Sequence, residues 1–239
     1  MTWSIVARDG AGAFGVAVAT KFFAVGALCP HAMSGVGALA TQALINPTWG
    51  PRGMALLREG SSAGDTLKLL VGSDAGHQTR QLHLIDAKGR IAQHTGSDCI
   101  GWCGHRTGAG FSVAGNMLAG QAVIDATAEV FAAGERMPLA ERLLAAMHAG
   151  EAQGGDKRGK QSAALLVYAG EDYPDLSLRV DDHGQPLQEL SRLHRVAQGR
   201  FAAFKTFMAT RANPSGLFDR QAIETEVARR EALLADMKS

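Results

Sequence analysis

Strand-like and helix-like segments follow one another in blocks along this chain, and this order constrains the fold more than any other feature. Short apolar and β-branched runs between glycines are typical of strands, and apolar residues three and four apart are typical of helices. Separate blocks indicate layers of antiparallel sheet and helix, because βαβ units would interleave the two. We expect strands in 2–44, helices in 46–74, strands in 80–118, helices in 120–154, strands in 161–182 and a helical tail from about 188.

The clearest local predictions are two hairpins and one helix start. "TWSIVA" at 2–7 and "VAVAT" at 16–20 flank a glycine-rich turn and predict a hairpin at the N-terminus. "QLHLID" and "RIAQHT" alternate apolar and polar residues around "AKG", which predicts a second hairpin. Ser61 or Ser62 can cap the helix that follows it. Two antiparallel sheets with helices on both outer faces would bury all these elements.

Composition excludes several classes of protein. Of the 239 residues, 46% are hydrophobic and 20% charged, with a formal net charge of +1, so we expect neither nucleic-acid nor membrane partners. No apolar run of about 18 residues predicts a spanning helix, and the N-terminus lacks a secretory pattern. The nucleophile elbow, the dinucleotide glycine motif and the phosphate-binding loop are all missing from the sequence. We expect no cofactor.

Three cysteines, an odd and sparse count, argue against a disulfide framework and favour a reducing cytoplasm. Cys99 and Cys103 lie four apart in "DCIGWCGHR", close to His105. A structural zinc site would need a second ligand pair, which the sequence does not offer. We therefore expect ordinary packing here and no metal.

Thr2 is the first candidate for chemistry. It directly follows Met1 and is small enough for that methionine to be trimmed. A free N-terminal threonine carries a hydroxyl nucleophile and an amine base on one residue. The following strand would hold it rigidly. The alternative is a β-branched residue that merely starts a strand.

Lys21, Thr41 and Gln42 are candidates to assist Thr2. Lys21 follows the second strand of the first hairpin, so pairing can return its ammonium toward the Thr2 hydroxyl and lower the hydroxyl pKa. The alternative is a solvated lysine at a strand end. Thr41 and Gln42 lie in "ALATQAL", where backbone N–H groups or the Gln42 amide can face an oxyanion. The alternative is ordinary ladder bonding.

Asn116 and Ser162 are further candidates. Asn116 lies at a predicted strand-to-helix change in "AGNMLAG", where its amide can donate to an oxyanion or, more commonly, cap the next helix. Ser162 begins a predicted strand and can share hydrogen bonds with Thr2 if that strand is central. Before it, the loop "GGDKRGK" contributes Lys157, Arg158 and Lys160, which can bind a substrate carboxylate or form a solvated turn.

These residues lie in motifs that resemble a known family. "TWSIVARD", "GVAVATKFFAVGALCPHA", "GVGALATQA", "GPRGMALL", "HTGSDCIGWCGHRTG", "GNMLAG" and "GGDKRGKQSAALLV" are similar to the bacterial family called domain of unknown function 1028. The resemblance covers about residues 2–190. That family is grouped with the N-terminal nucleophile (Ntn) hydrolases. The resemblance implies a four-layer αββα sandwich for residues 1–190, with 191–239 as a C-terminal helical extension.

The first sixty residues also resemble the start of a proteasome β subunit. That likeness maps Thr2 to the nucleophile, Lys21 approximately to the lysine that tunes it, and backbone N–H groups near Thr41 and Gln42 to the oxyanion hole. Asn116 and Ser162 match more loosely. The second strand departs from the pattern, because "AVAT" stands where the proteasome carries an aspartate.

Together these observations predict an amidohydrolase for a small amide or short peptide, acting through Thr2 after removal of Met1. The alternative is a catalytically silent small-molecule binding protein with the same fold. The helical tail carries aromatics in "FAAFKTFM" at 201–208. We expect them to pack on the sandwich or on a second subunit of a dimer or higher oligomer.

Overall fold

The computed structural model describes residues 2–236, so the predicted removal of Met1 lies outside the described residues. Two compact units divide between Leu190 and Ser191. The first contains both β-sheets, and each unit is described by itself below.

The larger sheet has six strands in the order β10-β9-β2-β1-β8-β7, all of them antiparallel to their neighbours. At its centre the hairpin of β1 and β2 is in register, with Trp3 opposite Ala19 and Arg8 opposite Phe14. These strands are β1 (Thr2–Arg8), β2 (Phe14–Thr20), β7 (Trp102–Gly108), β8 (Phe111–Leu118), β9 (Ser162–Tyr168) and β10 (Leu176–Val180).

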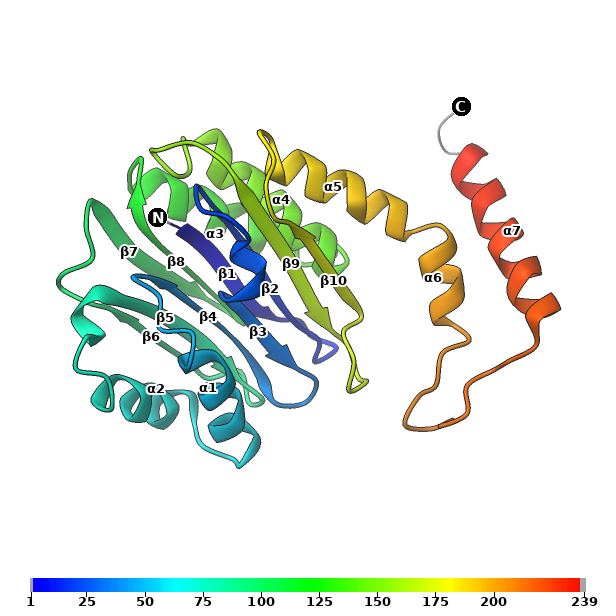
Figure 1. Cartoon of the computed structure of the whole chain (residues 1–239), viewed down its shortest axis with the longest axis horizontal. Coiled ribbons are helices and arrows are strands. Elements are labelled where there is room, and N and C mark those ends of the chain that lie inside the picture. The colour runs from blue at the N-terminus through cyan, green and yellow to red at the C-terminus, as the bar shows by residue number, and fades with distance from the viewer. Residues whose placement is uncertain (1, 237–239) are drawn as a thin grey trace. The chain divides into compact units, whose positions relative to one another are not determined.

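The smaller sheet has four antiparallel strands in the order β3-β4-β5-β6. They are β3 (Pro30–Met33), β4 (Gly37–Ala43), β5 (Arg80–Asp86) and β6 (Ile91–Thr95). Short 3₁₀ turns, η1 (Val25–Ala27) and η2 (His77–Thr79), lie before β3 and β5. The two sheets face each other through β1 against β4 and β5 against β8 (Figure 1).

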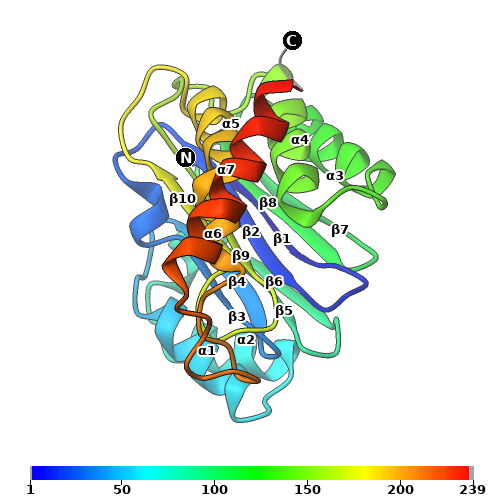
Figure 2. The ribbon, with the colours of Figure 1, turned by 90° about the vertical axis from the view of Figure 1, so that its right-hand side faces the viewer.

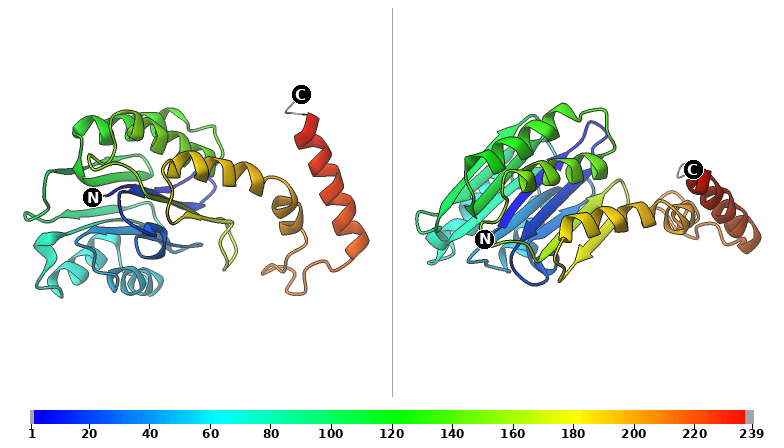
Figure 3. Two further views of the ribbon diagram at one scale, coloured as in Figure 1. Left: turned by 45° about the horizontal axis from the view of Figure 1, so that its top comes forward. Right: turned by 90° about the horizontal axis from the view of Figure 1, so that it is seen from above.

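Helices cover the outer face of each sheet. The pair α3 (Gln121–Ala133) and α4 (Leu139–Ala152) lies on the six-stranded sheet, and α1 (Trp49–Arg58) and α2 (Ala63–Gly72) lie on the four-stranded sheet. Figures 2 and 3 show the helix pairs on opposite sides of the strands. The predicted α+β fold and four-layer αββα sandwich are confirmed.

Burial follows from the side-chain alternation of the strands. Small and β-branched residues of β1, β2 and β4 form the core between the sheets, including Val6, Val18 and Ala40. A second core under α1 and α2 contains Leu39, Trp49 and Leu84. Odd and even residues of β4 and β5 therefore belong to different layers, because successive side chains point to opposite faces of a sheet. Alanine and valine allow the two sheets to approach closely over β1 and β2.

Residues 191–236 form the helical unit, in which α5 (Pro186–Ala197) continues from the first unit. The next helices are α6 (Arg200–Lys205) and α7 (Arg220–Asp236). Ala203, Ile223 and Val227 form a small core with Phe207 against it, and Arg200 pairs with Glu224. This core packs α6 against α7. The packing of this extension on the sandwich or on a second subunit stays a prediction.

Local predictions were confirmed in part. Ser62 caps α2 by accepting the N–H of Asp65 at 3.1 Å, whereas Cys103, for which we expected only ordinary packing, lies in strand β7. Within the strand block expected at 2–44, the segment after the first hairpin forms β3, from Pro30, and its partner β4. None of the helices within residues 2–236 is long and apolar enough to cross a membrane.

Two glycine substitutions in helices test the packing of the outer layer. A Cβ at Gly150 of α4 would collide with Thr127 Oγ1 and lie 2.9 Å from Trp3 Nε1, whereas one at Gly64 of α2 would only approach Ser62 Oγ at 3.9 Å. We expect Gly150→Ala to lower the free energy of unfolding by about 1–2 kcal/mol, since overpacking outweighs helix propensity. Gly64→Ala, the matched control, should raise it by up to about 1 kcal/mol. Urea unfolding of both variants measures the difference. Equal effects would contradict the close packing of α4.

Candidate functional site

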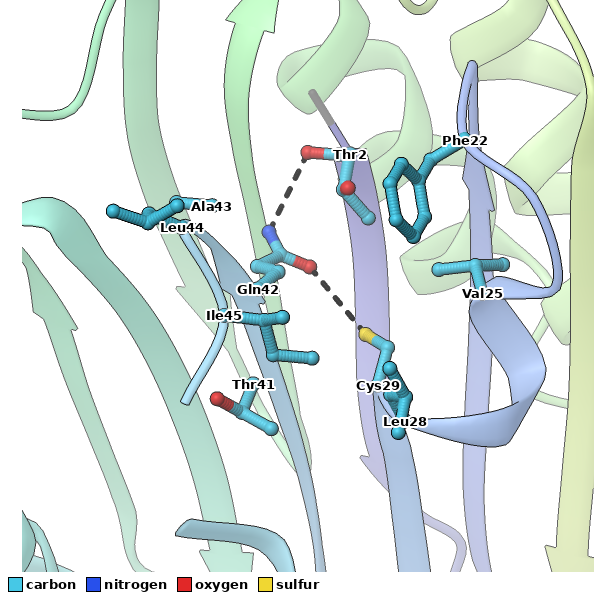
Figure 4. A pocket seen from close by; sticks show the side chains of 10 residues that line it. All are labelled: Thr2, Phe22, Val25, Leu28, Cys29, Thr41, Gln42, Ala43, Leu44 and Ile45. Carbon is cyan, nitrogen blue, oxygen red and sulfur yellow. Dashed lines mark hydrogen bonds between the residues drawn. The ribbon is translucent and has the colours of Figure 1, made fainter. Parts of the chain in front are cut away.

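Thr2 begins the central strand β1 and lines a cavity of about 180 Å³ between the two sheets. Only 7% of its surface is exposed. Its hydroxyl lies 3.2 Å from the hydroxyl of Thr20, at the end of β2. On the other side, β8 places Asn116 opposite Thr2. The strand neighbours therefore hold Thr2 from both sides and leave it facing the cavity (Figure 4).

Two side-chain amides donate to the carbonyl oxygen of Thr2. Gln42 Nε2 lies 3.5 Å from it and Asn116 Nδ2 lies 3.4 Å from it. Both amides also donate to Oε1 of Gln81, at 2.8 Å and 3.1 Å, and Gln42 Nε2 lies 3.2 Å from the Ala114 carbonyl. Each amide has two N–H donors, so both groups are committed to positioning Thr2 and the strands around it.

The network continues behind Gln42 to a buried histidine. Ser4 Oγ donates to Gln42 Oε1 at 2.6 Å and lies 2.8 Å from His83 Nε2. A hydroxyl has one hydrogen, so Ser4 must accept its second bond from Nε2–H of His83. The other ring nitrogen, Nδ1, lies 3.0 Å from Ser112 Oγ, whose single hydrogen has a second acceptor in Gln93 Oε1 at 3.4 Å. Burial, and after it the charge on His105, lowers the pKa of His83 to about 3. A neutral His83 fits this pattern.

The cavity wall is mostly apolar. Phe22, Val25, Leu28 and Ile45 line it beside Cys29, whose sulfur lies 3.8 Å from Gln42 Oε1. Burial raises the pKa of the Cys29 thiol, so the thiol stays protonated. Figure 4 shows Gln42 between Thr2 and Cys29, with hydrogen bonds to both.

A second cavity of about 410 Å³ adjoins the first through Ala43 and Leu44, which line both. Asn116, Asp98 and Arg158 line its polar part. The two cavities therefore adjoin at Ala43 and Leu44, and only the second contains charged side chains.

Strained backbone gathers around these cavities. Among residues 2–236, non-glycine residues have positive φ at three positions: Ala24 at 52°, Ala43 at 70° and Met117 at 52°. Ala43 lines both cavities, Met117 lines the second, and Ala24 precedes Val25 in the wall of the first. Each such conformation costs about 1–2 kcal/mol, and such strain clusters at functional sites. The surrounding contacts, among them a bond from Arg80 to the Leu44 carbonyl, hold this segment in place.

The structure places Lys21 differently from our expectation. Its ammonium donates to the Lys160 carbonyl at 3.2 Å on the exposed edge, while its neighbour Thr20 is the residue that meets Thr2. The reason is the hairpin register, in which Trp3 opposite Ala19 brings position 20, not 21, to Thr2. Thr41 lines the cavity, but its N–H already donates to the Cys29 carbonyl at 3.1 Å.

Asn116 and Ser162 have other contacts than those we expected. Asn116 lies inside β8, and Gly120 precedes α3 without a side-chain cap, so the capping alternative for Asn116 is wrong. Ser162 donates to the Phe22 carbonyl at 2.5 Å and accepts the Val25 N–H at 3.1 Å. Its strand β9 is separated from β1 by β2. Ser162 therefore fixes the loop that forms the cavity wall.

The basic loop is largely paired. Arg158 forms an ion pair with Asp156 at 3.2 Å, and Lys160 forms one with Glu151 at 3.0 Å, whereas Lys157 is exposed. Only Arg158 of these three lines a cavity near Thr2. Within residues 2–236, no cluster of three or more His, Cys, Asp or Glu side chains can hold a metal ion.

Sequence reasoning missed the buried half of the site. Ser4, Gln81, His83 and Ser112 occupy positions of β1, β5 and β8 that face the opposite sheet. Polar residues at inward positions of a strand were the available signal. Asp156 was also missed: its buried carboxylate accepts the N–H groups of Lys21 at 2.7 Å and Arg158 at 2.9 Å. An aspartate in a glycine-rich turn often makes such bonds.

One family model and two solved structures are similar to this chain. The model of a family described as "Family of unknown function (DUF1028)" matches residues 2–190. Protein SPO2555 from Silicibacter pomeroyi, a solved structure of that family, is 32% identical, covers 91% of this chain and 99% of its own, and superposes with a TM-score of 0.84. Anbu (ancestral beta-subunit) from Yersinia bercovieri is 11% identical, with coverages of 87% and 99% and a TM-score of 0.41. No curated protein matches the chain.

The buried His83 predicts a pH-dependent stability. Its pKa falls from 6.5 to about 3 on folding, so below pH 6.5 the unfolded chain binds a proton that the native state does not. The free energy of unfolding should therefore decrease as pH falls from 6.5 toward 3, by up to about 1.4 kcal/mol per pH unit from this residue. Urea unfolding of wild type and His83→Gln at pH 7, 5 and 4 measures it. The variant should lose this component, and identical pH dependence of the two proteins would refute the assignment.

Proposed function

The chain belongs to the family of unknown function DUF1028, and from the geometry around Thr2 we propose that it is an N-terminal nucleophile amidohydrolase. The substrate would be a small amide or a short peptide, and the reaction would need no cofactor. One observation carries the proposal: Thr2 lines a cavity, and two buried amides on its carbonyl fix its backbone there.

The proposed reaction begins after Met1 has been removed. The Thr2 hydroxyl oxygen attacks the amide carbonyl carbon, and the α-amine of Thr2 takes the hydroxyl proton. The tetrahedral intermediate then breaks its C–N bond, and the amine leaves with that proton. Water, activated by the same α-amine, hydrolyses the acyl ester, releases the carboxylic acid and restores the threonine.

The developing oxyanion needs N–H donors, and the observed contacts narrow the choice. The side-chain amides of Gln42 and Asn116 are already engaged. Backbone N–H directions alternate along a strand, so the N–H of Ala43 points to the same side as the N–H of Thr41. The Thr41 N–H donates to the Cys29 carbonyl. The pairing of β4 with β3 has already ended at Ala40, opposite Pro30. We assign the donor role to the Ala43 N–H, in a segment that the Arg80 contact holds in place against the strain of the positive φ at Ala43.

Substitution at Thr2 tests the proposal directly. Thr2→Ala removes the attacking oxygen, so we expect turnover of any amide substrate to fall by about 10³-fold or more. Thr2→Ser keeps a hydroxyl and an N-terminal residue small enough for methionine removal, and should keep measurable activity. A panel of fluorogenic acyl and peptidyl amides provides the assay.

Urea unfolding of both Thr2 variants serves as the folding control. A folded Thr2→Ala protein with full activity would refute the nucleophile. A processed wild type that turns over no amide would favour the silent binding protein instead.

A further inference from the structure

The lining of the cavity beside Thr2 suits an uncharged group. Its lining contains no charged side chain, and its polar members are Thr2, Thr41 and Gln42, with the protonated Cys29 thiol beside them. Both oxygen and nitrogen of the Gln42 amide already have partners, and Thr41 Oγ1 lies 3.5 Å from the Asn46 carbonyl. A charged group entering here would lose its water without gaining a partner.

The volume limits the size of that group. About 180 Å³ is close to the volume of an apolar protein cavity of about 150 Å³ that holds one benzene molecule. A branched chain of four or five carbons fits the same space. Phe22 and Leu28 complete the wall at its exposed side (Figure 4).

The adjoining cavity is also lined largely by apolar residues, but it includes charged side chains. It is larger and includes the Asp98 carboxylate and the Arg158 guanidinium, so it can accept a polar amine product. An aliphatic amine becomes protonated in water, and the Asp98 carboxylate offers it a partner that the first cavity lacks. The two parts of an amide substrate are thereby assigned to different cavities.

We propose that the substrate is an amide whose acyl group is small, uncharged and apolar, seated in the cavity of Phe22, Val25 and Leu28, with its polar amine portion toward Asp98 and Arg158. This inference rests on the proposed function. It replaces the acidic substrate suggested by the basic loop, because Arg158 and Lys160 are in ion pairs and Lys157 does not line either cavity beside Thr2.

Three anilides that share 4-nitroaniline as leaving group test the acyl preference. The probes are 4-methylpentanoyl, succinyl and 4-aminobutanoyl 4-nitroanilide, which have similar chain lengths and differ in charge. We expect kcat/KM for the first to exceed that of either charged probe by at least about 100-fold. Equal values, or a preference for a charged acyl group, would overturn the inference and leave the proposed function intact.

A lysine at the cavity rim provides the matched variant. Leu28 is 40% exposed and lines the cavity, whereas Leu69 on α2 is 53% exposed and lines neither cavity beside Thr2. Leu28→Lys should lower the ratio of 4-methylpentanoyl to succinyl turnover by at least about 10-fold, because an ammonium at the rim attracts the succinyl carboxylate. Leu69→Lys should leave the ratio unchanged. Equal ratios in both variants would place the acyl group elsewhere and overturn the assignment.

A binding measurement decides the question if no anilide is turned over, which would count against the proposed function. Titration calorimetry of the wild type with 4-methylpentanamide and with succinamate separates the two classes of ligand. We expect the apolar amide to bind at least about 10-fold more tightly, and Leu28→Lys to reduce that difference. Tighter binding of succinamate, or no binding of either probe, would overturn the inference about the cavity.

Discussion

Hydrogen bonds from Gln42 to the carbonyls of Thr2 and Ala114, and from Asn116 to Gln81, join the two sheets, and the site depends on them. Apolar strands of alanine and valine alone can pack in several offsets, because such contacts have little directionality. A buried amide that lacks its partner is costly, so this network favours one register. Ser4 and His83 extend it further between the sheets. The same contacts that align β4 and β5 with β1 and β8 therefore also fix the backbone of Thr2.

Loops at the end of β2 complete the site. The Asp156 carboxylate holds the N–H of Lys21, and Ser162 holds both the carbonyl of Phe22 and the N–H of Val25. These contacts shape the segment that carries the apolar wall beside Thr2. Charged side chains of the basic loop are thus paired with neighbouring groups, Arg158 with Asp156 inside the loop and Lys160 with Glu151 of α4. The result is a nucleophile candidate in a cavity without charged side chains, which adjoins a second cavity that contains Asp98 and Arg158.

Much of the fold was accessible from the sequence because its signals are local. The β1–β2 hairpin, the cap at Ser62 and the helix pairs follow from residue spacing within short windows. β7 was not identified as a separate strand within 80–118, because its glycines and Cys103 lack the alternation typical of a strand and only pairing with β8 defines it. The site residues also differ in how local their signals are. Position along the chain was enough to indicate Thr2. The roles of Gln81 and His83 depend on contacts with the opposite sheet, which the sequence does not specify locally. Lys21 was misplaced because a one-residue difference in register sends a side chain to the opposite face.

The intact mass of the native, untagged protein tests the central claim most directly, because the proposed mechanism requires a free amine on Thr2. The account predicts a mass that is short by one methionine. Incubation with the preferred amide substrate and rapid acid quenching should then add the mass of one acyl group to the wild type and none to Thr2→Ala. A protein that retains Met1 in full would contradict the account, since a peptide-bonded Thr2 nitrogen cannot accept the proton of its own hydroxyl.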